Sequence, residues 1–450
     1  MDAYALARGR PRSDQRHGGF CHGRPSGSEN HSAVRLLCIY QHAPTPGAPG
    51  IYRHRTLLAE LVRRGWTVDL VSSPINYMHG AAPEGYSGRW YRREVIDGVT
   101  HHWVRASEDV HRNMKRRALN YVTFAMTATA FASTLPRPDV IWASSPPLSV
   151  ASVGRALSRR FRRPWVFEVR DLWPETASSA GLLDENTRLY RLVDRFARTY
   201  ASKADGVLVP TPGLVDMVKE HGAKDVTLVT GAISDNPTDP EVRRRERELL
   251  DVPDGACLFA YMGAHGIING LDGLLDAIEL VAAGSGSGSG PDDVRFVLAG
   301  DGSAREQLQR RLAERPIPTL RMLGPVPKDR VLEILAASDV ALHMLRPDPL
   351  FASALPTKVL EYFGAHRAFI TTVPGLPERL ALESGGGFAP DVDGLAREIV
   401  RWSAMSPAER SERGDQAFAY GNERFGLEAT VDRLEELLMR TVGRAERNGI

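Results

Sequence analysis

The feature that most constrains this chain is an alternation between short apolar runs and helical stretches, which begins at Val34 and continues through most of the sequence. The apolar runs are rich in β-branched residues, and the helical stretches between them are about 10 to 20 residues long. This order is typical of βαβ units, in which helices connect parallel strands and cover the sheet. The sequence therefore predicts an α/β protein with parallel sheets.

The predicted strands form two series, separated by a polar connection that contains proline at 231–240. The strands predicted in the first series are Val34–Tyr40, Thr67–Ser72, a hairpin within Glu94–Arg105, Val140–Ala143, Trp165–Val169 and Gly206–Val209. Those predicted in the second series are Leu258–Met262, Arg295–Ala299, Thr319–Leu323, Val340–Leu345 and Ala368–Thr372. Two series of similar size predict two Rossmann-like, doubly wound domains.

The chain is expected to divide into four segments. Residues 1–32 are rich in Arg, Gly, Ser and His and lack an apolar core, so they are predicted to be a disordered tail rather than a signal peptide. Residues 33–230 and 231–410 are predicted to be the two domains. Residues 411–450 are predicted to be helices that pack back on the first domain, because apolar residues recur there in helical phase.

Composition excludes one class of partner. Among 450 residues, 57 Lys and Arg face 55 Asp and Glu, which gives a net charge of +2. Such a balance offers no general basic field for nucleic acid, so phosphate recognition is expected to be local. Only six of the basic residues are lysines. The three cysteines form no CxxC pair, which argues against a disulfide framework or zinc site and favours a cytoplasmic location.

One predicted helix, Met114–Leu135, has a basic start and an apolar remainder. This pattern allows two interpretations, a helix at a membrane surface or a helix that covers one face of the sheet. The covering helix is favoured because threonines and serines interrupt the apolar run, which is also too short to span a bilayer. Weak peripheral contact with the inner face of the membrane remains an expectation.

The segment 354–362 points most directly to a ligand. It predicts a helix that starts with proline, and the free amides at such a helix start bind anions. Lys358 in the first turn would add a full positive charge to a bound phosphate, with Leu355 and Thr357 beside it. Glu361, on the same face, suits a bidentate bond to ribose hydroxyls. The alternative is an ordinary surface ion pair.

Glycine-rich turns follow two strands of the second series. Gly300, Asp301 and Gly302 follow one, and Gly263 and Gly266 follow another. Ligands bind open α/β sheets at the carboxyl ends of the strands, where glycine allows the backbone to approach closely. The alternatives are a plain turn at the second site and, at the first, a turn in which Asp301 caps a helix.

These segments, in this order, resemble the family 4 glycosyltransferases of the GT-B fold, and among them the branch that builds bacterial exopolysaccharides and aminosugar-containing antigens. The resemblance runs from about residue 33 to about 440. It is carried by the Gly/Pro loop at 44–50, Arg63–Val68, Pro138–Ile141 with Ser144–Pro147, Arg170–Glu175, Tyr261–Gly263 with Gly266, Leu298–Gly302, Leu323–Val326 and Leu355–Tyr362.

The resemblance implies transfer of a sugar from a UDP- or GDP-sugar, with retention of anomeric configuration and with neither metal nor cofactor. It places the donor on the second domain, with Glu361 at the ribose, Lys358 near the diphosphate and the backbone of Val326 at the base. It implies an acceptor on the first domain and a cleft between the two.

The chain departs from the family in two places. Many relatives carry an Arg and a Lys in the loop after the first strand of the second domain, whereas this loop, Ala264–Asn269, has neither. Charge neutralisation would then depend on Lys358 and on Arg170 from the first domain. The first glutamate of the family's two-glutamate motif is replaced by Ser353, so contacts to the donor sugar would come from amides near Ser353 or from the other domain.

On the first domain, Arg170–Glu175 follows a predicted strand end. Asp171 or Glu175 is expected to orient or deprotonate the acceptor, with Trp173 packed nearby. The alternative is that Asp171 caps a helix and Trp173 is core. The loop with Gly47 and Gly50 is expected to border the diphosphate or the acceptor.

Two acceptor classes remain open. A lipid-linked or exopolysaccharide precursor follows from the resemblance, and a soluble metabolite, such as a natural-product scaffold or a low-molecular-weight thiol, fits a chain without a convincing membrane patch. Two further alternatives are a nucleotide-sugar 2-epimerase and a nucleotide-sugar-binding protein without turnover.

Overall fold

The computed structural model describes residues 34–48, 52–75, 80–108, 110, 114–179, 183–283, 294–346, 348 and 351–447. The predicted tail, residues 1–32, and the predicted site residue Gly50 lie outside these ranges.

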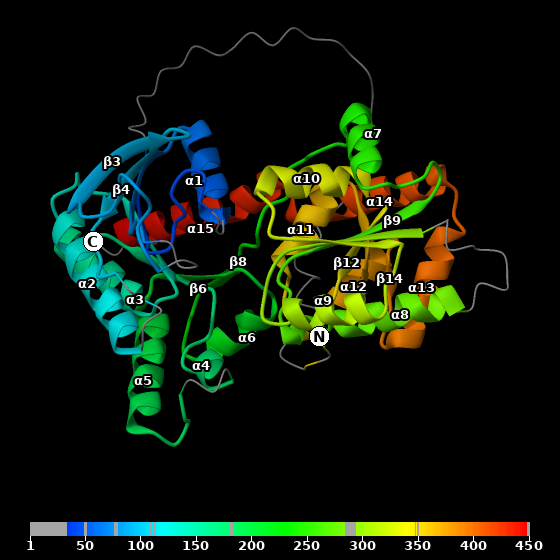
Figure 1. Cartoon of the computed structure of the whole chain (residues 1–450). Coiled ribbons are helices and arrows are strands. Elements are labelled where there is room, and N and C mark those ends of the chain that lie inside the picture. Colours follow the sequence, from blue (N-terminus) through cyan, green and yellow to red (C-terminus); the bar gives the residue numbers. More distant parts are fainter. Residues whose placement is uncertain are drawn as a thin grey trace, which may run out of the picture.

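The first half of the chain forms an eight-stranded sheet in the order β3-β4-β2-β1-β5-β6-β7-β8, in which only β3 is antiparallel (Figure 1). Its strands are β1 (Arg35–Tyr40), β2 (Thr67–Ser72), β3 (Tyr91–Ile96), β4 (Val99–Val104), β5 (Val140–Ser145), β6 (Trp165–Val169), β7 (Gly206–Val209) and β8 (Val226–Leu228). Its helices are α1 (Arg53–Arg63), α2 (Met114–Ala132), α3 (Ser149–Phe161), α4 (Glu175–Ser179), α5 (Arg188–Lys203) and α6 (Gly213–Glu220). Asp97 and Gly98 both have positive φ, as the turn of a tight hairpin requires.

The second half forms a six-stranded, fully parallel sheet in the order β11-β10-β9-β12-β13-β14. Its strands are β9 (Cys257–Met262), β10 (Val294–Ala299), β11 (Leu320–Leu323), β12 (Val340–His343), β13 (Ala368–Thr371) and β14 (Gly387–Phe388). Its helices are α7 (Pro240–Leu249), α8 (Leu271–Ala283), α9 (Arg305–Glu314), α10 (Lys328–Ala337), α11 (Thr357–Gly364), α12 (Leu376–Glu383), α13 (Val392–Ser403), α14 (Pro407–Phe425) and α15 (Leu427–Arg447), with the 3₁₀ turn η2 (Ile267–Asn269) after β9.

Both sheets are covered by helices, so the central strands are buried on both faces. The first sheet has a separate apolar cluster on each face, and the second sheet lies within one cluster. Every residue of β5, β6 and β9 is buried, which explains why these strands are mostly apolar and show no alternating pattern, with Glu168 of β6 as the charged exception. The predicted α/β class with two parallel, doubly wound units is confirmed.

The two C-terminal helices pack on different halves. Helix α15 packs on the first half, where Val431 is buried in a cluster with β1 and α1. Helix α14 packs on the second half, with Phe425 in the second core and Gly421 against the Phe363 ring of α11. The prediction that all of 411–450 packs back on the first half is therefore wrong for α14. Its apolar side chains complete the core under α11, and the chain crosses over only after Phe425.

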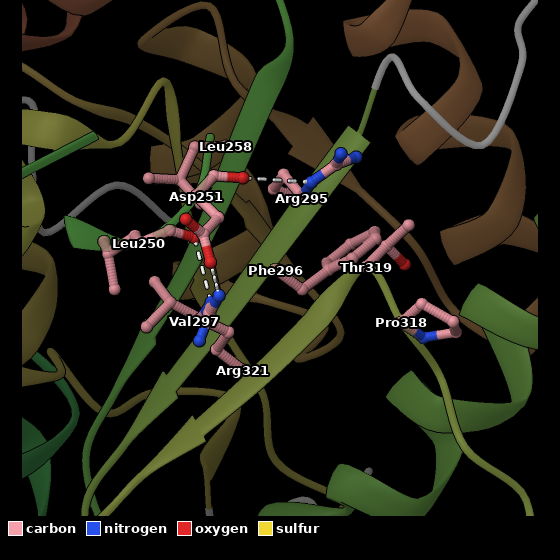
Figure 2. A pocket seen from close by; sticks show the side chains of 9 residues that line it. All are labelled: Leu250, Asp251, Leu258, Arg295, Phe296, Val297, Pro318, Thr319 and Arg321. Carbon is pink, nitrogen blue, oxygen red and sulfur yellow. Dashed lines mark hydrogen bonds and ion pairs between the residues drawn. The ribbon is translucent and has the colours of Figure 1, made fainter. Parts of the chain in front are cut away.

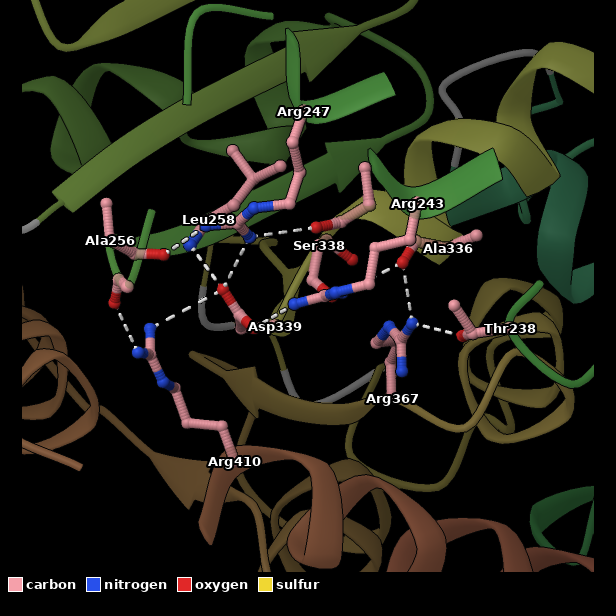
Figure 3. A network of polar contacts seen from close by, with 12 residues as sticks. Thr238, Arg243, Arg247, Ala256, Leu258, Ala336, Ser338, Asp339, Arg367 and Arg410 are labelled. Atoms are coloured by element: carbon pink, nitrogen blue, oxygen red, sulfur yellow. Dashed lines mark hydrogen bonds and ion pairs between the residues drawn. The ribbon is translucent and has the colours of Figure 1, made fainter. Parts of the chain in front are cut away.

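A buried carboxylate fixes α7 and α14 to the second sheet (Figure 3). Asp339, just before β12, accepts hydrogen bonds from Arg243, Arg247 and Arg410, and these arginines hold its pKa below the usual range despite burial. Arg243 and Arg247 also donate to carbonyls at the C-terminal end of α10, where cations stabilise a helix. This network lies at the amino end of β12, away from the edge where a ligand is predicted.

The carboxyl ends of the two sheets face each other. Tyr52, in the connection after β1, lies 5.7 Å from Nζ of Lys328, which follows β11. At a second point, a Cβ placed on Gly213 would lie 2.5 Å from Cβ of Ser353, so α6 and the loop before α11 are in contact. The predicted ligand edges of both halves therefore border one interface. None of the helices in the described ranges is both long and apolar enough to cross a membrane.

Candidate active site

The start of α11 forms the centre of the donor side. The helix begins at Thr357, one residue later than predicted, with Pro356 before it and no side chain that caps its amides. Leu355 is buried in the second core and anchors the start, whereas Thr357 is exposed. These amides and the dipole of the helix make a favourable position for an anion.

Lys358 lies folded over Tyr261 of β9. Its Nζ is 4.6 Å from the centre of the Tyr261 ring and donates to the Tyr261 hydroxyl at 3.4 Å. Burial lowers the pKa of Lys358 to about 8, and the nearby Glu361 carboxylate opposes this shift only in part. A diphosphate beside Nζ would raise this pKa again, because an opposite charge favours the charged form. The position of Lys358 therefore favours the binding of an anion beside its Nζ.

Two glycine loops interlock beside Lys358. The amide of His265 donates to the carbonyl of Asp301 at 2.8 Å. A Cβ on Gly300, at φ +147°, would lie 1.8 Å from the Gly263 carbonyl oxygen, and one on Gly302 would lie 2.7 Å from His265. These two glycines are thus required by the contact between the loops, a reason that the sequence analysis did not foresee. Gly263 faces the ligand region more directly, since a Cβ there would lie 2.8 Å from Lys358 Nζ.

Asp301 and Gly266 complete the two loops. The Asp301 side chain is exposed, and its Oδ1 accepts from the amide of Gly302 at 2.9 Å. It does not cap α9, which starts at Arg305 without a side-chain cap, so Asp301 belongs to the turn rather than to the helix. The amide of Gly266 donates to Asn269 Oδ1 at 3.1 Å.

Glu361 is paired, but not with Lys358. Its Oε1 accepts from Nζ of Lys328 at 3.3 Å, and both side chains are partly exposed. An exposed ion pair contributes about 0 to 1 kcal/mol, so ribose hydroxyls could displace it at low cost. Val326, two residues before Lys328, is partly buried and packs against the second core.

Three further residues lie on this side and were not among the predicted site residues. Lys328 could have been found, because lysines are rare in this chain. Arg305 places its guanidinium nitrogens 3.3 to 3.5 Å from the position of a Cβ on Gly324, in the loop after β11. His265 is fully buried between the glycine loops, neither ring nitrogen has a hydrogen-bond partner among the described residues, and burial lowers its pKa. No pattern in the sequence identifies these last two.

On the first half, Arg170 and Asp171 follow the end of β6. Arg170 lies with Cζ 5.0 Å from the centre of the Tyr40 ring, at the end of β1. Burial raises the pKa of Asp171, while Arg170 opposes the shift. Asp171 and Trp173 line a small, mostly apolar pocket together with Ala197 of α5. A carboxylate with a raised pKa at the edge of a pocket suits proton uptake.

Glu175 and Gly47, which are also predicted on the acceptor side, do not line the pocket of Asp171 and Trp173. Oε1 of Glu175 lies 3.0 Å from Nε2 of His221, and this hydrogen bond holds the Glu175 pKa below its usual range despite partial burial. Gly47 has φ +76° in an exposed turn after β1, with open space where a Cβ would be.

A buried ion pair that the sequence analysis missed connects the first half to the chain segment leading to the second. Glu168, in β6, is fully buried, with Oε2 2.8 Å from His54 Nε2 and Oε1 bound to Arg53. These neighbours hold the Glu168 pKa far below its usual value despite burial. Arg53 also donates to the carbonyls of Val229 and Thr230, which precede the connection to α7.

A separate pocket lies at the opposite edge of the second sheet (Figure 2). It is lined by the amino-terminal parts of β10 and β11, including Arg295 and Arg321, and the latter pairs with Asp251. The glycine loops follow the other end of β10, so this pocket is not part of the candidate active site.

Comparisons with known proteins agree with this arrangement. Residues 50–231 match the glycosyl transferase 4-like domain family, and residues 256–404 match the glycosyl transferases group 1 family. WbjE of Pseudomonas aeruginosa, named as a glycosyltransferase, is 25% identical over 258 residues, which cover 56% of this chain and 62% of WbjE. WcaI of Escherichia coli K12, named for colanic acid biosynthesis, is 22% identical over 336 residues, which cover 72% of this chain and 79% of WcaI.

Solved structures support the fold. Anabaena HepE in complex with UDP-glucose superposes with a TM-score of 0.64 at 16% identity, over 90% of this chain and 100% of HepE. The sucrose-phosphate synthase of Thermosynechococcus elongatus gives a TM-score of 0.67 at 16% identity, over 91% of this chain and 100% of that protein. The two family models together match both halves of the chain, and the solved structures share its two-domain fold. This chain therefore belongs to the nucleotide-sugar-dependent glycosyltransferases of the GT-B fold, of the family 4 type.

Proposed function

We propose that this protein transfers a sugar from a nucleoside diphosphate donor, with retention of anomeric configuration and without a metal ion, to a lipid-linked or exopolysaccharide precursor. The observation that supports the donor side is the position of Lys358, which is partly buried at the start of α11 with its Nζ beside Gly263. HepE, which shares this fold, binds UDP-glucose and UDP, so a UDP-sugar is the first donor to test.

Charge changes during transfer explain the proposed roles of these residues. As the bond between the sugar and the diphosphate breaks, the leaving group gains negative charge and the sugar becomes oxocarbenium-like. The amides of α11 and the Lys358 ammonium would stabilise the charge on the leaving group. Glu361 would exchange Lys328 for the ribose hydroxyls. Arg170 would add positive charge from the first half.

The acceptor would lie on the first half, where Asp171 accepts its proton and Trp173 borders it. The raised pKa of Asp171 supports this role, because a base is most effective when its pKa approaches the working pH. The relatives WbjE and WcaI are named as glycosyltransferases, and WcaI is named for colanic acid biosynthesis, which favours a polysaccharide precursor. A soluble acceptor remains the second candidate.

The charged and potential metal-binding side chains support a reaction without a metal ion. Among the described residues, one group of three potential ligands converges within 4.8 Å, formed by Glu175, Asp194 and His221 of the first half. Glu175 pairs with His221, and Asp194 pairs with Arg198. On the donor side, Lys358 and backbone amides provide the positive charge that a cation would otherwise supply.

The first experiment measures stabilisation of the purified protein by a panel of UDP-, GDP- and dTDP-sugars. Nucleotide release is then followed with and without membrane extract, with EDTA in parallel, and the product anomer is assigned by NMR. Release that depends on an acceptor and yields a retained anomer is expected. An epimer formed without acceptor would establish the epimerase instead, and donor binding without release would establish a protein that only binds the nucleotide sugar.

A further inference from the structure

Three helices of the first half carry an unusual charge. Helices α2 and α3 each contain three basic side chains and no acidic one, and α5 contains five basic side chains and one acidic one, Asp194. The whole chain has a net charge of only +2, so the remainder is acidic. In the second half, α7 and α14 mix both signs, and α8 carries acidic side chains only. The basic charge is therefore concentrated on this layer.

The three helices form one layer on the same face of the first sheet. Helix α3 contacts both α2 and α5 (Figure 1). Phe124 of α2, Leu157 of α3 and Ala201 of α5 are buried in one apolar cluster with the sheet. The preferred prediction for α2, a helix that covers the sheet, thus describes its inner face.

Apolar side chains are exposed on the outer face of α5. Leu189, Leu192 and Phe196 are 56%, 51% and 46% exposed, and their spacing places them along one stripe. Arg188, Arg191 and Arg195 form an adjacent exposed stripe. Arg198, on the same helix, pairs with Asp194, whereas Arg191 and Arg195 form no ion pair with any described acidic side chain.

Helix α2 repeats this combination. Leu119, Val122 and Met126 are 45%, 53% and 68% exposed and also follow one stripe. Lys115, at the start of the helix, is exposed as well. Such a pattern, with apolar side chains beside arginines and lysines, is that of helices which lie in the interface of an anionic bilayer.

We propose that the outer faces of α5 and α2, with α3 between them, dock this protein on an anionic lipid bilayer. Charge complementarity argues for this occupant: a basic layer on an otherwise acidic chain attracts anionic headgroups, and the exposed apolar side chains enter the acyl boundary. We refer to Leu189, Leu192 and Phe196 of α5, with the adjacent Arg188, Arg191 and Arg195, as the α5 docking face.

The position of α5 suggests what membrane docking would do for the reaction, an inference that rests on the proposed function. The inner side of α5 contributes Ala197 and Ala201 to the pocket that Asp171 and Trp173 also line. Phe196 stacks on Tyr200 with ring centres 6.1 Å apart, so the docking face is in contact with the inner side of the same helix. A lipid-linked acceptor could then reach the first half without leaving the bilayer surface.

The test is co-sedimentation of the full chain with vesicles of phosphatidylcholine that contain phosphatidylglycerol, and with vesicles of phosphatidylcholine alone. Binding to the anionic vesicles, weakened by high salt, is expected. The double variant Arg191→Glu/Arg195→Glu should lower binding at least roughly 30-fold, because each basic side chain near an anionic surface contributes a several-fold factor. Leu192→Ser/Phe196→Ser should lower it roughly tenfold.

Matched controls come from exposed residues of the second half. Arg310→Glu/Arg397→Glu and Leu382→Ser/Val400→Ser make the same chemical changes there and should leave binding unchanged. Should the reversed arginines impair folding, Arg191→Gln/Arg195→Gln replaces them. Stabilisation by a nucleotide sugar, measured on each variant, should persist, which separates loss of docking from failure of the proposed function.

Two results would overturn the inference. The first is that the protein does not bind anionic vesicles, or that the α5 variants and the control variants change this binding equally. The other is a dimer that Leu192→Ser/Phe196→Ser dissociates without any effect on vesicles, because the apolar stripe would then contact a second copy of the chain.

Discussion

The two halves present different material at their shared interface. The second half ends its strands in glycine loops, with Gly263, Gly300 and Gly302 packed against each other and one lysine above them. In the first half, functional side chains follow the strand ends instead: Arg170 lies over the Tyr40 ring, and Asp171 lines a pocket. Backbone amides and a single cation suit the constant part of a nucleotide sugar. Side chains can be substituted during evolution while the backbone stays in place, which suits the recognition of acceptors that differ between relatives.

The largest effect tests the packing of the glycine loops. Gly300→Ala would place a Cβ 1.8 Å from the Gly263 carbonyl oxygen at φ +147°. It should cost about 3 kcal/mol of unfolding free energy or more, and abolish stabilisation by the donor. Gly47→Ala, at φ +76° in open space, should cost about 1 kcal/mol and leave donor binding intact. Equal losses in urea unfolding would contradict the contrast between the halves.

The next effect tests how far the donor side depends on one charge. Lys358→Ala should lower kcat by roughly 10²- to 10³-fold, because the leaving group loses its cation. Lys328→Ala removes only a partly exposed ion pair with Glu361, and should change kcat/KM less than roughly fivefold. The measurement is nucleotide release over a range of donor concentrations, which gives kcat and kcat/KM for each variant. If both variants lose activity alike, the diphosphate is not held mainly by Lys358.

A smaller effect should be confined to the acceptor side. Asp171→Asn should slow transfer roughly 10²-fold, as expected for loss of a general base, and leave stabilisation by the donor unchanged. Asp216→Asn, which removes an exposed carboxylate of the same half, serves as the control. A loss of donor binding in Asp171→Asn would show that the two halves do not divide the work in this way.

The smallest effect is a dependence on pH, which is expected in the alkaline range for the second half and in the acid range for the first half. Burial lowers the pKa of Lys358 to about 8, so donor affinity should be complete below pH 8 and fall at most about tenfold per unit above it. Unfolding releases this lysine to a pKa of about 10.4, so between these values the unfolded state binds more protons and stability rises with pH.

The first half should respond in acid instead. The Glu168 pKa is lowered by Arg53 and His54, so its contribution to stability is present above the usual glutamate pKa and is lost as pH falls through the folded value. Titration of donor affinity and of unfolding free energy over both pH ranges checks these expectations. In Lys358→Gln the alkaline changes should vanish, and a slope that persists there would assign them to another group.

Much of the fold followed from local pattern. Thr67–Ser72, Trp165–Val169 and Gly206–Val209 are observed with the predicted bounds, because β-branched runs between turn residues leave little choice. The edge strands β8 and β14 were missed. They contain three and two residues, too few for a recognisable pattern, and they exist only because a neighbouring strand pairs with them.

The sequence by itself determined the two parallel sheets, the glycine loops and the start of α11, since these depend on residue types at short spacing. Only the tertiary structure decided which charges meet. It paired Glu361 with Lys328 rather than Lys358, enclosed Glu168 between Arg53 and His54, and sent α14 and α15 to different halves. Ion pairs and helix contacts join residues far apart in the chain, and short-range pattern carries no information about which distant partner is near.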